Sequence, residues 1–145
     1  MFKHILVPVD GSSTAVLAVD KAIGLARAFG SKVTVVFVID PYPFAGVGTD
    51  FSYGQTEYLS AATAEANAAV KTARETIEAA GVPVATSIVE AHAAWRGVVD
   101  AATSGQADLI VMGSHGRSGL EKLVLGSVAQ HVLSHTRLPV LVVRD

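Results

Sequence analysis

Three glycines and a serine stand at fixed intervals after a run of apolar residues. The stretch GSHGRSGLEKLVLGS at 113–127 directly follows ADLIVM at 107–112, and its spaced positions are Gly113, Gly116, Gly126 and Ser127. Glycine lets the backbone bend freely and lets amide groups approach a ligand closely, while the N-terminus of a following helix attracts anions. The pattern therefore favours a phosphate-binding loop. Because glycine patterns alone are weak signals, a loop that only turns the chain is the alternative.

The better-known phosphate and hydrolase signatures do not fit this sequence. No glycine precedes a lysine, which disfavours a lysine-dependent nucleoside triphosphatase. Gly46 and Gly48 begin a dinucleotide pattern, but Phe51 stands where its third glycine belongs. The run from Gly116 to Gly119 has the wrong spacing for a G-x-S-x-G nucleophile elbow.

The hydrophobic pattern alternates between strand-like and helix-like segments along the whole chain. Apolar, β-branched runs predict five strands, at 4–9, 32–39, 84–90, 107–112 and 139–143. Apolar residues at helical spacing predict four helices, at 15–29, 59–80, 93–104 and 126–135. The chain is therefore predicted to be a single-domain α/β protein with an open, parallel, five-stranded sheet and helices on both faces.

One segment does not follow this alternation. Residues 40–54, DPYPFAGVGTDFSYG, combine prolines, glycines and aromatic residues. We expect a surface loop there rather than a domain boundary, and a segment that could move.

Ligands of open parallel sheets bind beyond the carboxyl ends of the strands, near the point where the strand order reverses. The first predicted strand delivers PVDGS at 8–12 to this edge, and the second delivers residues 38–40. The fourth delivers the glycine loop itself. We expect these three tips to converge on one site.

Composition excludes several classes of function. The 145 residues are 50% hydrophobic, carry a formal net charge of −2 and include no cysteine. Scattered charges disfavour nucleic acid as a partner, and the absence of cysteine removes disulfides and thiolate metal sites. No apolar run approaches the roughly 20 residues that span a bilayer, and Asp10 comes too early for a signal peptide. We expect a cytoplasmic protein without a membrane partner.

Four stretches carry a resemblance to a known family. HILVPVDGSSTA, VFVID, DLIVMGSHGRSGLEKLVLGSVAQHVL and LPVLVV resemble the ATP-binding branch of the universal stress protein family over essentially the whole chain, as one domain of residues 1–145. The resemblance implies a Rossmann-like fold of the adenine nucleotide alpha hydrolase type. It also implies an ATP-responsive stress or signalling module that uses the G-x2-G-x9-G-S loop, with Mg²⁺ or Mn²⁺ as the accompanying ion.

The resemblance assigns nucleotide-binding roles to residues from three of the predicted strand ends. These residues are Pro8, Val9, Asp10, Val38, Met112, Gly113, Ser114, His115, Gly116, Arg117, Gly126, Ser127, Val128 and Ala129. Asp10 is also the candidate metal ligand, through water, with helix capping as its alternative. Val38 is expected to contact adenine, or to be sheet core instead. Ala129 stands where many relatives carry a hydroxyl, so one phosphate contact is expected to be missing.

Two other features have mainly structural interpretations. His131 and His135 lie one helical turn apart, as zinc ligands can, but the glutamate of H-E-x-x-H is missing and no third ligand is evident in the sequence. Trp95, the only tryptophan, fits core packing better than an exposed partner contact.

Three functional hypotheses stay open at this point. An ATP-responsive binding module fits best, because no acid–base pair or activated nucleophile can be assembled from the sequence. The alternatives are a slow ATPase or phosphoryl-transfer enzyme at the same site, and a nucleotide-independent interaction module. The family's dimers use the last strand, so a homodimer through Val140 to Val143 is expected.

Overall fold

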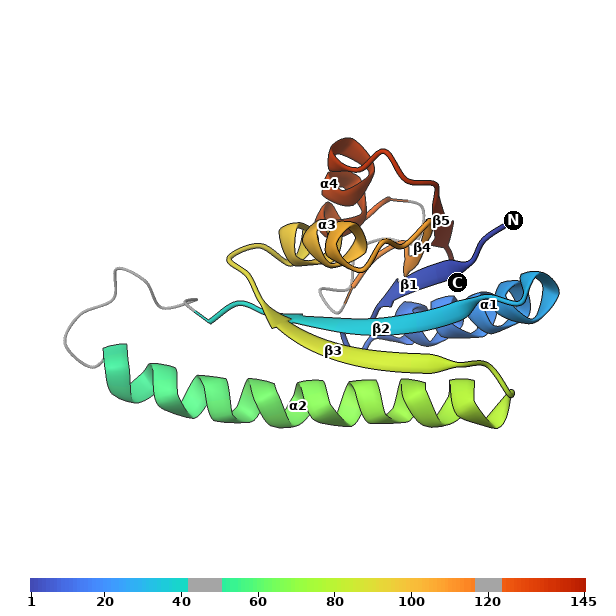
Figure 1. Cartoon of the computed structure of the whole chain (residues 1–145). Helices are drawn as coiled ribbons and strands as arrows, with labels where there is room; N and C mark the ends of the chain where they lie inside the picture. The colour runs from blue at the N-terminus through green and yellow to red at the C-terminus, as the bar shows by residue number, and fades with distance from the viewer. Residues whose placement is uncertain (42–50, 117–123) are drawn as a thin grey trace.

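The computed structural model describes residues 1–41, 51–116 and 124–145. Its elements follow the chain in this order: β1 His4–Pro8, α1 Ser13–Phe29, β2 Lys32–Ile39, α2 Phe51–Ala79, β3 Val84–Glu90, α3 Ala94–Ser104, β4 Leu109–Gly113, α4 Ser127–His135 and β5 Val140–Val143. The strands form one five-stranded sheet in the order β3-β2-β1-β4-β5, and every pair is parallel (Figure 1). The predicted fold class is confirmed.

Alternate residues of the strands face two separate hydrophobic layers. Ile5 and Val7 of β1 pack with α1 and α2, whereas Leu6, between them, packs with α3 and α4. Figure 1 shows α1 and α2 on one side of the sheet and α3 and α4 on the other. The sheet is covered on both faces, which explains why its strands read as continuous apolar runs.

Local signals set the ends of α1. The Ser12 side chain accepts a hydrogen bond from the Ala15 backbone N–H at 3.2 Å, and this caps the first turn. Gly30 ends the helix in the left-handed conformation, with φ of 67°. Both ends were predicted from the sequence to within about two residues.

The second helix is longer than predicted. The sequence placed residues 51–54 in a surface loop, but α2 begins at Phe51, so that part of the prediction is wrong. The glycine and aromatic residues of this part suggested a loop, yet a helix tolerates a glycine such as Gly54 at a cost of about 1 kcal/mol. Residues 42–50 lie outside the described part of the chain.

The order of the strands places β1 at the centre of the sheet. The chain moves outward from β1 through β2 to β3, and then crosses to the other side of β1 to form β4 and β5. The order therefore reverses between β1 and β4. Their carboxyl ends carry the turn at residues 8–12 and the glycine segment that begins at Gly113.

No helix within residues 1–41, 51–116 and 124–145 has both the length and the apolar character needed to cross a membrane.

Helix α3 approaches β2 so closely that one of its residues has no space for a side chain. A Cβ on Gly97 would lie 2.7 Å from both methyl carbons of Val38. Gly24, on the exposed side of α1, has no such neighbour within 4 Å. The two helical glycines thus differ in packing.

We predict opposite effects of alanine at these two positions. Gly97→Ala should lower the free energy of unfolding by about 1–3 kcal/mol, because Val38 or α3 must move. Gly24→Ala should raise it by about 0.5–1 kcal/mol, because alanine favours the helix. Urea unfolding of wild type and both variants measures these free energies, provided that the dependence of the free energy on urea concentration has the same slope in all three. A neutral Gly97→Ala would contradict the close packing of α3 on Val38.

Asp108 ties the N-terminal residues to the start of β4. Its carboxylate accepts hydrogen bonds from the backbone N–H groups of Lys3 at 2.9 Å and His4 at 3.0 Å. Burial raises the pKa of Asp108, but these hydrogen bonds and the neighbouring His4 outweigh burial and hold the pKa below its ordinary value.

We predict a pH-dependent loss of stability in Asp108→Asn. Because the folded pKa is lowered, the carboxylate stabilises the fold above its unfolded pKa of about 3.9. This contribution disappears as the pH falls through the lower, folded value. Urea midpoints should therefore differ between wild type and variant near pH 7 and converge in strong acid. A constant difference at all pH values would contradict this role.

Candidate functional site

The turn after β1 is fixed by its own hydrogen bonds. The Val9 N–H donates to the Val36 carbonyl at 2.9 Å, which holds the end of β1 against β2. Asp10 accepts the Ser12 N–H on Oδ1 at 2.9 Å, and Gly11 takes a positive φ of 83° that favours glycine. The Asp10 side chain is half-buried. The alternative of Asp10 as a helix cap is not borne out, because Ser12 caps α1 and Asp10 instead fixes the turn before it. Asp10 Oδ2 faces the glycine segment.

The glycine segment after β4 packs directly on this turn. A Cβ on Gly113 would lie 2.6 Å from Thr14 Oγ1, and a Cβ on Gly116 would lie 2.6 Å from Asp10 Oδ2. The buried Thr14 hydroxyl also donates a short hydrogen bond to the His115 carbonyl. Two segments about one hundred residues apart in the sequence therefore meet with only glycine between them.

Helix α4 begins beside the same segment. Gly126 is its N-cap, and its N–H donates to the Ser114 carbonyl at 2.7 Å. A Cβ on Gly126 would come within 3.1 Å of the His115 Cα. The N-cap residue Gly126 has no side chain with which to cap the helix, and Ser127 is exposed at its first turn. The positive end of this helix is thus available to an anion.

A cavity of about 480 Å³ lies between α2 and the carboxyl ends of β1 and β2. Its size is in the range of pockets that hold small ligands. Its lining combines apolar and polar side chains, namely Asp10, Phe37, Val38, Ile39, Asp40, Tyr58, Ala61, Ala62 and Glu65. Two of the predicted site residues, Asp10 and Val38, line this cavity. The Val38 methyl carbons pack toward α3, so the alternative interpretation of Val38 as sheet core also holds.

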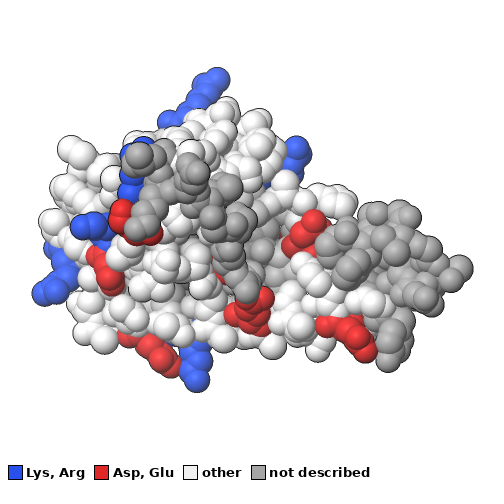
Figure 2. Space-filling view, turned by 180° about the vertical axis from the view of Figure 1, so that it is seen from behind, with Lys and Arg blue, Asp and Glu red and all other residues white. Residues whose placement is uncertain are grey.

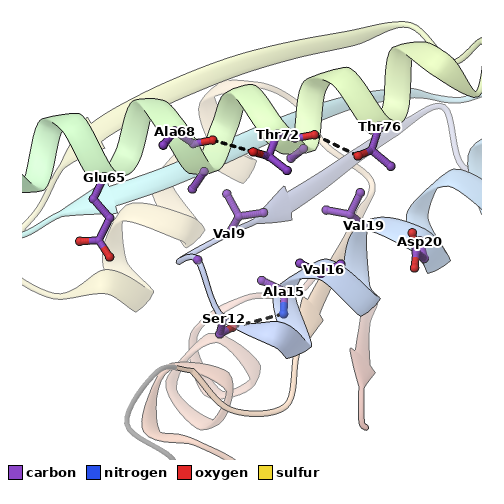
Figure 3. Close-up of a pocket in the computed structure, with 13 residues that line it drawn as sticks. Val9, Ser12, Ala15, Val16, Val19, Asp20, Glu65, Ala68, Thr72 and Thr76 are labelled. Atoms are coloured by element: carbon purple, nitrogen blue, oxygen red, sulfur yellow. Dashed lines mark hydrogen bonds between the residues drawn. The ribbon is translucent and has the colours of Figure 1, made fainter.

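A groove of about 370 Å³ adjoins this cavity and separates α1 from α2 (Figure 3). Figure 3 shows Val9, Val16 and Val19 between the two helices, with Glu65 and Asp20 toward opposite ends. The hydroxyls of Thr72 and Thr76 are satisfied by carbonyls one turn earlier on α2, which leaves the groove largely apolar. Glu65 lines both spaces, so the groove and the cavity are neighbours.

Two buried polar atoms of the glycine segment have no hydrogen-bond partner among the described residues: Ser114 Oγ and His115 Nε2. His115 Nε2 lies 3.6 Å from Asp145 Oδ1, which is close enough for an ion pair when the imidazole is protonated. The Ser114 N–H donates to the Val143 carbonyl at 2.8 Å, so the segment is also held to β5. A ligand at the glycine segment could therefore accept a hydrogen bond from a side chain that the fold already holds in place.

The remaining predicted residues divide into three groups. Pro8, Val9, Ser114 and Gly126 surround the strand ends. Met112 and Ala129 are buried in the hydrophobic layer beneath α3 and α4, with Val128 packed against it. Arg117 lies outside the described residues.

The sequence analysis missed some residues of this site. Thr14 connects the two tips, but nothing in the sequence pairs it with His115. Tyr58 and Glu65 bring α2 to the cavity, and the only sequence signal was their position as polar residues beside the apolar stripe of that helix. Gly97, which packs closely against the Val38 methyl carbons, was not among the predicted site residues.

Charges do not gather into a basic patch on the face drawn in Figure 2. Lysine and arginine side chains alternate there with acidic and uncharged ones.

The fold and this edge define a class of protein: an open, parallel α/β sheet with a ligand-sized cavity at the carboxyl ends of β1 and β2, next to the point where the strand order reverses between β1 and β4. Comparisons with known proteins identify the family. A sequence model described as the Universal stress protein family matches residues 1–144. The chain therefore belongs to the universal stress protein family.

Individual relatives agree with this assignment. Universal stress protein MJ0531 of Methanocaldococcus jannaschii is 37% identical over 144 residues, which cover 99% of this chain and 83% of the relative. The solved structure of the hypothetical protein MJ0577 from the same organism superposes with a TM-score of 0.84 at 31% identity, covering 99% of this chain and 96% of the other.

Two other similar structures contain adenine nucleotides. One is a universal stress protein in complex with cAMP, with a TM-score of 0.68, 26% identity, and coverage of 98% of this chain and 96% of the other. The second is the Archaeoglobus fulgidus universal stress protein in complex with dAMP, with a TM-score of 0.70, 25% identity and 97% coverage of both chains.

Proposed function

We propose that this protein binds ATP at the carboxyl edge of its sheet and acts as a nucleotide-responsive stress or signalling module. The observation that carries the proposal is the meeting of Asp10 with the Gly113–Gly116 segment beside a cavity of about 480 Å³. Relatives of this chain have been solved with cAMP and dAMP, which supports an adenine nucleotide as the ligand.

The parts of the nucleotide have different requirements, and the edge offers a group for each. Adenine is flat and apolar on its faces, and it would lie in the cavity against Val38. The phosphates would take backbone N–H groups of the glycine segment, together with the N-terminus and the Ser127 hydroxyl of α4. The Ser114 hydroxyl and the His115 imidazole are the nearest additional donors.

Asp10 fits a divalent ion that is held mainly by phosphate oxygens and water. Mg²⁺ typically binds to proteins in this way, through one or two carboxylates. Asp10 Oδ1 is taken by the Ser12 N–H, so Oδ2 is the atom that would accept from a metal-bound water. Within the described residues no group of three His, Cys, Asp or Glu is present, so a site built from protein ligands alone is not favoured here. The bound ion would neutralise phosphate charge.

The first test is to identify what the purified protein carries and what it binds. Protein prepared without added nucleotide is denatured, and any released small molecule is identified by mass. Calorimetric titration with Mg-ATP, ADP, AMP and cAMP then ranks the ligands. We expect ATP to bind with about one site per chain. No binding of any of the four would contradict the proposal, and favour the nucleotide-independent alternative. Conversion of bound ATP to ADP would support the slow ATPase.

Two substitutions test the site without disturbing its packing. Asp10→Asn keeps an oxygen for the Ser12 N–H but removes the charge, and Ser127→Ala removes an exposed hydroxyl. Each should weaken Mg-ATP binding by about tenfold or more, as expected for loss of a hydrogen bond to a charged group. Asp20→Asn, exposed on α1, is the matched control and should bind as wild type. Gly113→Ala is a poor probe, because its Cβ would overlap Thr14.

We further propose that two copies associate through β5. This strand is the end of the sheet, and Leu141 on it is 40% exposed. An apolar edge strand exposes unpaired backbone groups, which a second copy can satisfy by pairing about a twofold axis.

The association predicts a specific effect of charge on the edge. Leu141→Lys should convert the dimer to a monomer, because a charge beside the pairing edge disfavours strand addition. Val16→Lys, at an exposed valine of α1, should leave the dimer intact. Light scattering at micromolar concentration measures both. A monomeric wild type, or dissociation by both variants alike, would contradict the proposed interface.

A further inference from the structure

Three aromatic rings stack on the surface formed by α3 and α4, far along α4 from its N-terminus. Trp95 of α3 lies 4.1 Å from His135 and 5.6 Å from His131, measured between ring centroids, and all three rings are nearly parallel. Figure 1 shows α3 and α4 side by side on one face of the sheet. We call Trp95, His131 and His135 the ring stack.

Hydrogen bonds show which ring nitrogen carries a hydrogen in each of the two imidazoles. His131 Nδ1 lies 2.7 Å from the Ser127 carbonyl, and His135 Nδ1 lies 2.7 Å from the His131 carbonyl. A carbonyl oxygen only accepts, so Nδ1 carries the hydrogen in each ring. In the neutral imidazole the lone pair is then on Nε2. Metal-bound histidines are held in the same way, with the second nitrogen donating to a carbonyl or carboxylate.

Position and exposure make these two lone pairs available together. His131 and His135 are four residues apart on one helix, so they share a face, and both are exposed. The ring centroids are 6.1 Å apart and the planes differ by 14°. An ion with metal–nitrogen bonds of about 2.0–2.1 Å can bridge such rings after small side-chain rotations. Trp95 limits the other orientations that the two rings could adopt.

We propose that His131 and His135 form a binding site for a divalent first-row transition-metal ion, of the Ni²⁺, Cu²⁺ or Zn²⁺ type. Imidazole nitrogen suits these ions and does not suit Mg²⁺ or Ca²⁺. Water completes the coordination, because the described residues contain no group of three His, Cys, Asp or Glu. The site is separate from the nucleotide cavity, and it does not depend on the proposed function.

The sequence analysis disfavoured a metal here because it found neither the glutamate of H-E-x-x-H nor a third ligand. Among the described residues the structure shows neither that glutamate nor a third ligand. What the structure contributes is the hydrogen bond from each Nδ1 to a carbonyl and the support of both rings by Trp95, which lower the cost of ordering two ligands. The result is an open site with two protein ligands, which predicts weaker binding than a closed structural zinc site.

The fluorescence of Trp95 can report the binding of a metal ion to the ring stack. Trp95 is the only tryptophan in the chain, and its ring is 4.1 Å from His135. A paramagnetic Ni²⁺ ion on the two imidazoles should quench Trp95 fluorescence to a saturating level. Zn²⁺, which is not paramagnetic, should compete and restore the emission. The protein must carry no polyhistidine tag, and calorimetry with Zn²⁺ gives a second, independent reading.

Matched variants locate the ion. His131→Gln and His135→Gln should each weaken Ni²⁺ binding by about tenfold or more, in line with the loss of a metal-positioning group. His92→Gln removes another exposed histidine and should bind Ni²⁺ as wild type does. Circular dichroism and urea unfolding confirm that the variants fold. Equal, or non-saturating, quenching in wild type and both glutamine variants would overturn the proposal.

Two further variants test where the ion binds and whether this site is independent of the nucleotide site. The Arg96 guanidinium lies 5.0 Å from the Trp95 ring centroid, and its charge opposes a second cation. Arg96→Gln should therefore tighten Ni²⁺ binding at low ionic strength, and a weaker affinity would contradict the placement of the ion. Asp10→Asn should leave Ni²⁺ binding unchanged while it weakens Mg-ATP binding, so failure of either proposal is visible without the other.

Discussion

The structure depends on the contact between the β1–α1 turn and the segment that follows β4. Gly113 lies against Thr14 and Gly116 against Asp10, and at both positions a Cβ would come within 2.6 Å of a side-chain oxygen. The Thr14 hydroxyl closes this contact by donating to the His115 carbonyl. Since the sheet order reverses between β1 and β4, the same contact both joins the two halves of the sheet and creates its ligand-facing edge. Folding and the candidate site therefore share one constraint.

Because the same contact serves both the fold and the candidate site, Gly113 and Gly116 must be interpreted with care for their packing role. Gly113 and Gly116 are required by close packing whether or not a phosphate is bound, so their presence alone does not distinguish a binding loop from a structural one. The features that packing does not require are different ones. Helix α4 begins at Gly126, which has no capping side chain, and Asp10 keeps one carboxylate oxygen toward the glycine segment. A cavity of about 480 Å³ adjoins the carboxyl ends of β1 and β2. These features, rather than the glycine count, carry the nucleotide proposal.

Periodicity and turn residues were enough to predict most of the fold, because each strand is covered on both faces and each helix has one apolar stripe. The Ser12 cap and the Gly30 stop of α1 are local signals, and local signals are readable from the sequence. The error at residues 51–54 arose because glycine and aromatic residues favour a loop only weakly, and a helix accommodates Gly54 at a cost of about 1 kcal/mol. Thr14 and Gly97 act through contacts with residues distant in sequence, and no spacing rule predicts such pairs.

Helix α4 connects the two proposed sites in nine residues. Its first residue, Ser127, is exposed at the end that the nucleotide proposal assigns to phosphate, and the Ser127 carbonyl accepts the hydrogen bond that orients His131. A ligand at either end can act on the other only through a difference in its affinity for two positions of this helix. If such a difference exists, linkage requires the effect to be reciprocal: a metal ion that weakens nucleotide binding must itself be weakened by the nucleotide, by the same factor. The hydrogen bond from His131 to the Ser127 carbonyl is one direct connection between the two sites, and it lies within α4.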